Sequence, residues 1–200
     1  MLKKFKEWLI GEVPNGSSAV VANKRLAERV ELSESQLLIA EKHLLQVLVA
    51  SHEHVQDMLT IQAKCYNGKT PWNAAALQHE LKRNTRAFYI LLKHETLPVA
   101  FIGAWLVEGE AHITNVAVIP DYQGMGIATW LIHELERLSI LEQMKVLSLE
   151  VRISNEKAKR LYRKLGFVDG QIKRGYYSSN LEDALEMSKP LVRVEQVDAT

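Results

Sequence analysis

An apolar strand, a glycine-bearing turn and the start of a helix follow one another directly in residues 116–131, VAVIPDYQGMGIATWL. The alternating apolar run ends at Pro120, which has no N–H to donate to a sheet ladder. Gly124 and Gly126 then allow a tight turn and leave no Cβ above its amides. The first N–H groups of the helix that follows have no partner within the helix and favour negative charge. This stretch therefore predicts a seat for a phosphate group.

The turn differs from two common phosphate loops. No Gly-Lys-Ser/Thr follows it, as a Walker loop requires, and it lacks the full G-x-G-x-x-G with a later acidic residue for a ribose. The pattern Gln-x-x-Gly-x-Ala, from Gln123 to Ala128, resembles the loop that holds the pyrophosphate of coenzyme A in the GNAT superfamily of N-acetyltransferases. The alternative interpretation is a turn that binds no ligand and only stabilises its own backbone. The rest of the chain has to distinguish between these two interpretations.

Length and composition predict one soluble α/β domain with room for an appendage. The chain has 200 residues, of which 47% are apolar and 24% charged, and its net charge of +1 gives no reason to expect direct nucleic-acid binding. A single cysteine, Cys65, excludes an internal disulfide and suits a reducing compartment. No apolar run is long enough to span a membrane, and the start lacks a signal-peptide pattern, so we expect a cytoplasmic protein. His52 and His54 have no third ligand in view, and we predict no metal.

Hydrophobic periodicity predicts an α/β (α+β) fold with a mixed, mostly antiparallel central sheet and helices on both of its faces. Short polar turns join the three middle strands, which indicates an antiparallel meander. The expected strands are 45–50, 88–92, 99–106, 111–119, 146–153, 167–172 and 184–187, and the expected helices are 55–66, 70–81, 127–138 and 155–165.

Three segments are expected along the chain. Residues 1–41 form an N-terminal extension with room for a short helix and a strand, and residues 1–10 have the apolar spacing of an amphipathic helix. Residues 42–192 form the main domain, and residues 193–200 form a C-terminal tail. The helix at 70–81 is predicted to begin with Thr70 as its N-cap and Pro71 at its first position.

Two residues could carry acid–base chemistry. Glu150 lies in a strand expected to be covered on both faces, where partial burial would raise the pKa of a carboxylate so that it accepts a proton near neutrality. Tyr162 lies on the next helix, on the stripe facing the sheet. Its phenol, with an ordinary pKa of about 10, could protonate a leaving thiolate whose conjugate acid has a pKa of about 8.5. Alternatively, Glu150 is exposed or pairs with Arg152 or another neighbour, and Tyr162 is a core aromatic whose hydroxyl finds a main-chain partner.

A closer resemblance begins at this strand. The run LEVRISNEKAKRLYRKLGF, residues 149–167, is followed by Arg174-Gly175-Tyr176-Tyr177 and by Glu182-Asp183-Ala184 with Met187. Together these resemble the ribosomal-protein-alanine N-acetyltransferase branch of GNAT, the RimI type. With the phosphate turn and Pro71-Trp72, the resemblance covers roughly residues 45–190. It implies the GNAT fold and acetyl-CoA as co-substrate without a metal. It also implies transfer of acetyl to the N-terminal α-amine of a ribosomal protein that begins with alanine.

The resemblance also implies roles for individual residues. Glu150 would be the general base, acting directly or through water, and Tyr162 the general acid for coenzyme A. The expected cofactor-binding residues are Val116, Ala117, Val118, Gln123, Gly124, Met125, Gly126, Ile127, Ala128 and Asn155. The expected peptide-binding residues are Trp72, Tyr176 and Tyr177.

The implied mechanism is direct attack of an amine on the thioester, since Cys65 lies in no motif that would make it a nucleophile. An α-amino group has a pKa of about 7.7–8.0, whereas a lysine, at about 10.4, costs roughly 3–4 kcal/mol to deprotonate. This favours a protein N-terminus. Two alternatives remain: a GNAT enzyme acting on lysine side chains or a small amine, and a non-catalytic acyl-CoA-binding module, against which Glu150 and Tyr162 argue. The family's short members lack the first 40 or so residues, so the acceptor is less defined than the chemistry.

Overall fold

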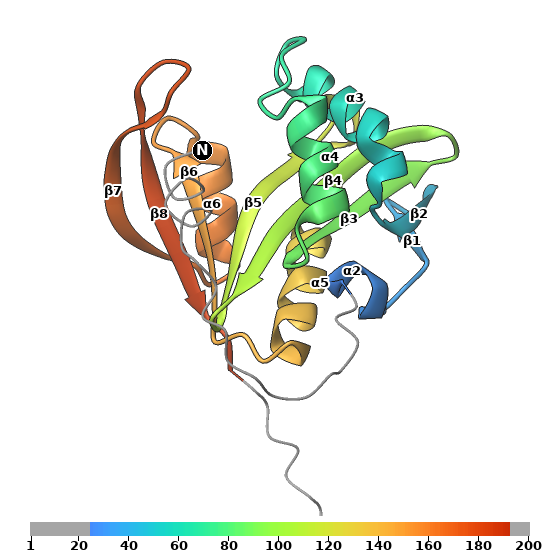
Figure 1. Ribbon diagram of the computed structural model, residues 1–200. Helices are drawn as coiled ribbons and strands as arrows, with labels where there is room; N and C mark the ends of the chain where they lie inside the picture. Colours follow the sequence, from blue (N-terminus) through green and yellow to red (C-terminus); the bar gives the residue numbers. More distant parts are fainter. Residues whose placement is uncertain (1–24, 193–200) are drawn as a thin grey trace, which may run out of the picture. The chain divides into compact units, whose positions relative to one another are not determined.

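The computed structural model describes residues 25–192, which form two compact units (Figure 1). The first unit comprises residues 25–149 and 188–192, and the second comprises residues 150–187. The helix predicted at residues 1–10 and the tail at 193–200 lie outside the described residues. Within the described part, no helix is both long and apolar enough to cross a membrane.

The helices and strands follow the order that periodicity predicts. The first unit contains α2 (Leu26–Arg29), β1 (Gln36–Ile39), β2 (His43–Val49), the 3-10 helix η1 (His52–His54), α3 (Val55–Cys65), α4 (Ala74–Arg83), β3 (Ala87–His94), β4 (Leu97–Val107), β5 (Glu110–Val118), the 3-10 helix η2 (Pro120–Tyr122) and α5 (Ile127–Leu141). The second unit contains α6 (Glu156–Lys164) and β7 (Val168–Tyr177). Strands β6 (Val146–Arg152) and β8 (Glu182–Pro190) have residues in both units.

The strands are hydrogen-bonded in the order β1-β2-β3-β4-β5-β6-β8-β7. Neighbours from β1 to β5 are antiparallel, whereas β5 and β6 are parallel. Strands β3 and β4 are buried on both sides, over residues 87–92 and 98–104. The cause is visible in the first unit, where α3 and α4 pack on one face of these strands and α5 on the other (Figure 1). The predicted mixed, mostly antiparallel sheet with helices on both faces is confirmed.

A β-bulge bends β5 at Thr114. Gly103 pairs with Asn115 and Ala104 with Ile113, so Thr114 is an extra residue opposite β4. A bulge of this kind kinks its strand and increases the local twist. The parallel pairing of β5 with β6 ends at the same point, at Ile113 opposite Leu149. Within the first unit, the edge of residues 114–118 that faces away from β4 therefore has no strand paired to it among the described residues.

Residues 25–41 are packed into the first unit and contribute an added edge strand. Strand β1 pairs with β2 from Gln36 opposite Gln46 to Ile39 opposite His43. The segment before it is attached to α5, because the main-chain N–H and the hydroxyl of Ser33 donate to the two carboxylate oxygens of Glu134 at 2.7 and 2.8 Å.

Several element boundaries differ from the predictions, most clearly those of α4, β7 and β8. The helix expected at 70–81 begins at Ala74, so the assignment of Thr70 as N-cap and Pro71 as first position was wrong. The actual cap is Asn73, whose Oδ1 accepts the N–H of Ala76 at 2.9 Å. Strands β7 and β8 also run further than 167–172 and 184–187, because a largely exposed edge strand such as β7 needs no apolar alternation to continue.

Candidate active site

The turn after β5 has the geometry of an anion seat. Gly124 and Gly126 have φ angles of +81° and +84°, which residues with a Cβ rarely adopt. A Cβ built on either glycine would meet no atom of the chain within 4 Å, so the space above the turn is open. Gly126 is the N-cap of α5 and provides no capping side chain, and the first turn of α5 contains no acidic residue. The first amides of α5 are therefore available to a negatively charged group.

Two side chains fix the end of β5 below this turn. The side-chain amide of Gln123 donates from Nε2 to the carbonyl oxygen of Val118 at 3.0 Å. The thiol of Cys65, on α3, donates to the same oxygen at 3.3 Å. Burial raises the pKa of this thiol, although the hydrogen bond opposes the effect. Cys65 is thus held as a neutral thiol, which agrees with the absence of a nucleophile motif around it.

A tyrosine and two histidines support the turn from the neighbouring strand ends. Tyr122 is buried directly before Gln123, and its hydroxyl lies 2.6 Å from Nδ1 of His94 at the end of β3. The His43 ring, from the start of β2, stands edge-on to the His94 ring with centroids 5.0 Å apart. Sequence reasoning missed both histidines, because strand pairing brings them together from distant positions that carry no local motif.

Trp72 is held rigidly in the loop before α4. Its N–H donates to Oε1 of the fully buried Gln62 at 2.9 Å, and its carbonyl accepts from Nε2 of the same side chain at 3.1 Å. The Trp72 ring packs edge-on to Trp105, which donates its indole N–H to Glu80 at 2.5 Å. Burial raises the pKa of Glu80, against the effect of that hydrogen bond. Sequence reasoning overlooked Glu80, which lies three residues after the buried Leu77 on the inner side of α4.

Glu150 is buried in the second unit, with only 4% of its side chain exposed, and it has a cationic partner. Nζ of Lys173, on β7, lies 2.5 Å from Oε1 of Glu150 and 2.6 Å from Oε2 of Glu186 on β8. The alternative that Glu150 is solvent-exposed is wrong, whereas the alternative that it pairs with a neighbour is confirmed by its contact with Lys173. Burial disfavours the charged form of its carboxylate, whereas the ammonium favours it.

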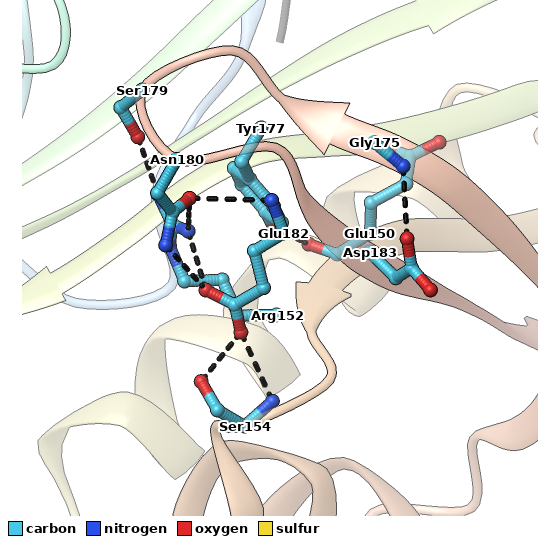
Figure 2. A network of polar contacts seen from close by, with 9 residues as sticks. All are labelled: Glu150, Arg152, Ser154, Gly175, Tyr177, Ser179, Asn180, Glu182 and Asp183. Atoms are coloured by element: carbon cyan, nitrogen blue, oxygen red, sulfur yellow. Dashed lines mark hydrogen bonds and ion pairs between the residues drawn. The ribbon is translucent and has the colours of Figure 1, made fainter.

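Arg152, two residues further along β6, organises a second polar network (Figure 2). Its guanidinium donates to Glu182 at 2.7 Å and to Asn180 at 3.0 Å. Glu182 also accepts the N–H and the hydroxyl of Ser154, and these contacts lower the pKa of Glu182 to about 2. The guanidinium carbon of Arg152 lies 3.9 Å from the ring centre of Tyr177. The network therefore joins the loop between β7 and β8 to the end of β6.

The remaining predicted residues of the second unit have defined surroundings. Tyr177 donates its hydroxyl to the main-chain oxygen of Glu150 at 3.3 Å (Figure 2). Burial, together with the charge of Glu150, raises the pKa of Tyr176. Tyr162 is buried on α6 and packs against Phe167, with ring centres 5.6 Å apart. Asn155 caps α6, because its Oδ1 accepts the N–H of Ala158 at 3.1 Å.

The structure thus brings the predicted residues together in two groups. Residues 116–118 and 123–128 meet in the first unit, and Glu150, Tyr176 and Tyr177 meet in the second. A peptide slot that combines Trp72 with the two tyrosines stays a prediction, because they belong to different units, and so do the roles assigned to Glu150, Tyr162 and Asn155. Across residues 25–192, no three His, Cys, Asp or Glu side chains are grouped to hold a metal ion.

Comparison with known protein families shows the family to which this chain belongs. Residues 55–167 match the acetyltransferase (GNAT) family, which is more than half of the chain. The chain belongs to this family and is an acetyltransferase.

Individual relatives within this family carry more specific names. A protein of Bacillus subtilis (strain 168), provisionally named ribosomal protein bS18-alanine N-acetyltransferase, is 35% identical over 135 residues, which is 68% of this chain and 88% of that protein. The ribosomal protein bS18-alanine N-acetyltransferase of Escherichia coli (strain K12) is 42% identical over 96 residues, which is 46% of this chain and 64% of that protein. The crystal structure of the ribosomal-protein-S18-alanine N-acetyltransferase from Escherichia coli is similar with a TM-score of 0.67 and 27% identity, covering 76% of this chain and 97% of that one.

Proposed function

We propose that this protein transfers the acetyl group of acetyl-CoA to the N-terminal α-amine, an alanine, of a ribosomal protein in the cytoplasm. The names of its relatives support this acceptor. The acidity of the acceptor supports it too, because an α-amine needs less help than a lysine to lose its proton. The observation that carries the proposal is the open glycine turn at Gly124 and Gly126, which leads into an uncapped helix beside the bulged strand β5.

The cofactor would occupy groups of the first unit. Main-chain amides from Gln123 to Ala128 would bind the pyrophosphate, and the edge of Val116–Val118 beyond the bulge would align the pantetheine arm through main-chain hydrogen bonds. Asn155 is proposed as a further contact. Bound acetyl-CoA supplies a thioester whose carbonyl carbon is open to attack by an amine.

Two side chains would move the protons. Glu150 takes a proton from the attacking amine, directly or through water, as the new C–N bond forms. Tyr162 gives a proton to the sulfur as the C–S bond breaks. General acid–base help of this kind contributes roughly 10²–10⁴-fold to a rate. Trp72, Tyr176 and Tyr177 would hold the acceptor peptide.

Mass spectrometry of peptides incubated with enzyme and acetyl-CoA tests this function. One peptide begins with a free alanine, a second has that α-amine blocked but contains lysine, and a third begins with a different residue. We expect acetylation of the first peptide on its α-amine. Acetylation of the blocked peptide alone would establish a lysine acetyltransferase instead. Binding of acetyl-CoA without transfer to any acceptor would indicate a non-catalytic module.

The variants Glu150→Gln and Tyr162→Phe test the two roles. Each should lower kcat by roughly 10²–10⁴-fold. Calorimetric binding of acetyl-CoA serves as the control and should be unchanged. A Glu150→Gln enzyme that turns over as fast as the wild type would remove Glu150 as the base.

A further inference from the structure

Lys173 bridges two carboxylates across three strands of the second unit. In the strand order β6-β8-β7, its side chain starts on the outermost strand and reaches past β8 to β6. Its Nζ lies 2.6 Å from Oε2 of Glu186, on the middle strand, and 2.5 Å from Oε1 of Glu150, on the far one. The same Nζ is 5.9 Å from the ring centre of Tyr176. One ammonium thus serves two carboxylates of unequal exposure.

Because the two carboxylates differ in exposure, the loss of Lys173 would cost Glu150 more than Glu186. The side chain of Glu150 is 4% exposed and that of Glu186 is 37% exposed. A buried carboxylate without a partner is costly to keep charged, whereas a partly exposed one is solvated by water. Burial alone would lower the pKa of Lys173, but its bonds to Glu150 and Glu186 outweigh this and raise it. The ammonium of Lys173 therefore stays charged, and Glu150 depends on that charge.

We propose that Lys173 is a positioning residue for Glu150, which it holds in place and in its ionised form, and that Glu186 anchors Lys173 and moderates its effect. The proposal rests on the function proposed above, in which Glu150 accepts a proton. In that role its carboxylate must be ionised before the amine arrives. Lys173 would set the pH at which this condition is met.

Other groups of the second unit face Glu150 as well. Tyr176 contributes a neutral phenol that is hydrogen-bonded to the Glu150 side chain, and its pKa is raised by burial and by the charge of Glu150. Tyr177 donates its hydroxyl to the main-chain oxygen of Glu150. Arg152, on the same strand, directs its guanidinium to Glu182 and Asn180. Among these groups, Lys173 is the cation that contacts the carboxylate of Glu150.

Removing the two partners of this cluster should move the titration of Glu150 in opposite directions. Lys173→Met removes the cation while Glu150 stays buried, so the carboxylate should keep its proton to a higher pH. Glu186→Gln removes a neighbouring negative charge and leaves Lys173 to Glu150 alone, so the proton should leave at a lower pH. A role in folding alone predicts no such opposition.

Carbon-13 NMR of glutamate-labelled protein without substrates tests this directly, with the Glu150 signal assigned by its loss in Glu150→Gln. We expect the midpoint of its titration to rise by about one pH unit or more in Lys173→Met and to fall in Glu186→Gln. Arg174→Met is the matched control. It removes one positive charge from the same strand, but the Arg174 side chain is 82% exposed and pairs with Asp183, so the midpoint should not change.

The pH dependence of kcat/KM gives a second readout. Its acidic limb should shift with the NMR midpoint, kcat should recover at high pH in Lys173→Met, and Lys173→Arg should restore the wild-type profile. An equal loss of activity at every pH, or unchanged midpoints in both variants, would overturn the proposal. If Lys173→Met does not fold, an unchanged midpoint in Glu186→Gln, whose side chain is partly exposed, overturns it alone.

The two proposals can fail separately. Loss of activity in Glu150→Gln together with unchanged titrations would leave Glu150 as the base and remove Lys173. Shifted titrations in a protein that acetylates no peptide would keep the cluster and remove the proposed function.

Discussion

At the scale of single residues, Gly124 and Gly126 show how conformation and space are separate requirements. Their φ angles of +81° and +84° would strain a residue that has a Cβ, while the chain itself leaves the space above them open. That space is where the proposed cofactor would lie. Gly68, after α3, has a similar φ of +82° and equally open surroundings, yet it belongs to an ordinary loop.

Substitution of Gly126 and of Gly68 should separate the cost of strain from the loss of cofactor binding. Gly126→Ala should destabilise the protein by about 1–2 kcal/mol, the usual cost of the left-handed conformation, and it should also raise KM for acetyl-CoA. Gly68→Ala should cost similar stability but leave KM unchanged. Thermal melts and steady-state kinetics measure both quantities. Equal KM values in the two variants would remove the anion-seat interpretation of the turn.

A second residue-scale prediction concerns the hydrogen bond of 2.6 Å between His94 and Tyr122. His94→Phe removes a support of the turn without touching the cofactor, so KM for acetyl-CoA should rise by roughly two- to tenfold at unchanged kcat, as expected for one hydrogen bond. Tyr122→Phe should have the same effect, and the double variant should be no worse than either single one. Additive losses would show that the two side chains act independently.

At the scale of elements, the caps of the helices divide the helix starts into two kinds. Asn73 and Asn155 cap α4 and α6 with their side-chain oxygens, whereas Gly126 leaves α5 uncapped. A capping side chain occupies the amides that an anion would otherwise use. The contrast supports α5, rather than α4 or α6, as the helix that receives the phosphates.

Asn155 has both a capping contact in the structure and a predicted contact with the cofactor, and substitutions can separate them. Asn155→Ala should lower the free energy of unfolding by about 1 kcal/mol. Asn155→Ser should restore stability, because serine also caps, but not KM for acetyl-CoA, because it lacks the amide. Asn73→Ala, measured by the same urea titration, should lower stability with KM unchanged. If Asn155→Ser restored both the stability and KM for acetyl-CoA, Asn155 would be a helix cap without a cofactor contact.

Sequence patterns predicted the elements well where one physical signal dominates. Apolar runs marked β3 and β4, because both faces of these strands are buried, and the glycine turn marked the start of α5. The same patterns misplaced the start of α4, since Pro71 and Asn73 are both plausible first-turn signals and only the anchoring of Trp72 by Gln62 decides between them. Lys173 could not be predicted as a partner of Glu150, because that contact crosses a strand and has no fixed spacing in the chain.

At the scale of the whole molecule, carboxylates with lowered pKa values are distributed over both units. Charge-assisted and main-chain hydrogen bonds hold the pKa of Glu182 at about 2 and outweigh the effect of burial on Glu134, whose pKa is also lowered. A depressed folded-state pKa contributes stability that is fully present above the ordinary value and is lost as the pH falls through the folded value.

Stability should therefore decline in acid. For Glu182, the loss should run from pH 4.5, its ordinary value, towards about 2. Urea unfolding of the wild type and of Glu182→Gln at a series of pH values measures this, and the variant should show a shallower decline. Glu28→Gln, at an exposed glutamate on α2, is the control and should follow the wild type. Parallel curves for the wild type and Glu182→Gln would contradict the assignment.

The two hydrogen bonds from Ser33 to Glu134 link the beginning of the described chain to α5, the helix that starts at the turn of Gly124 and Gly126. Glu134 lies about two helical turns beyond Gly126, and its side chain is 4% exposed, with Ser33 and Arg137 as partners. Trimming the protein to the length of its shorter relatives, by starting it at residue 42, would strip two donors from a nearly buried anion. We therefore expect residues 25–41 to brace α5, so that their removal raises KM for acetyl-CoA at the turn where the coenzyme is proposed to bind.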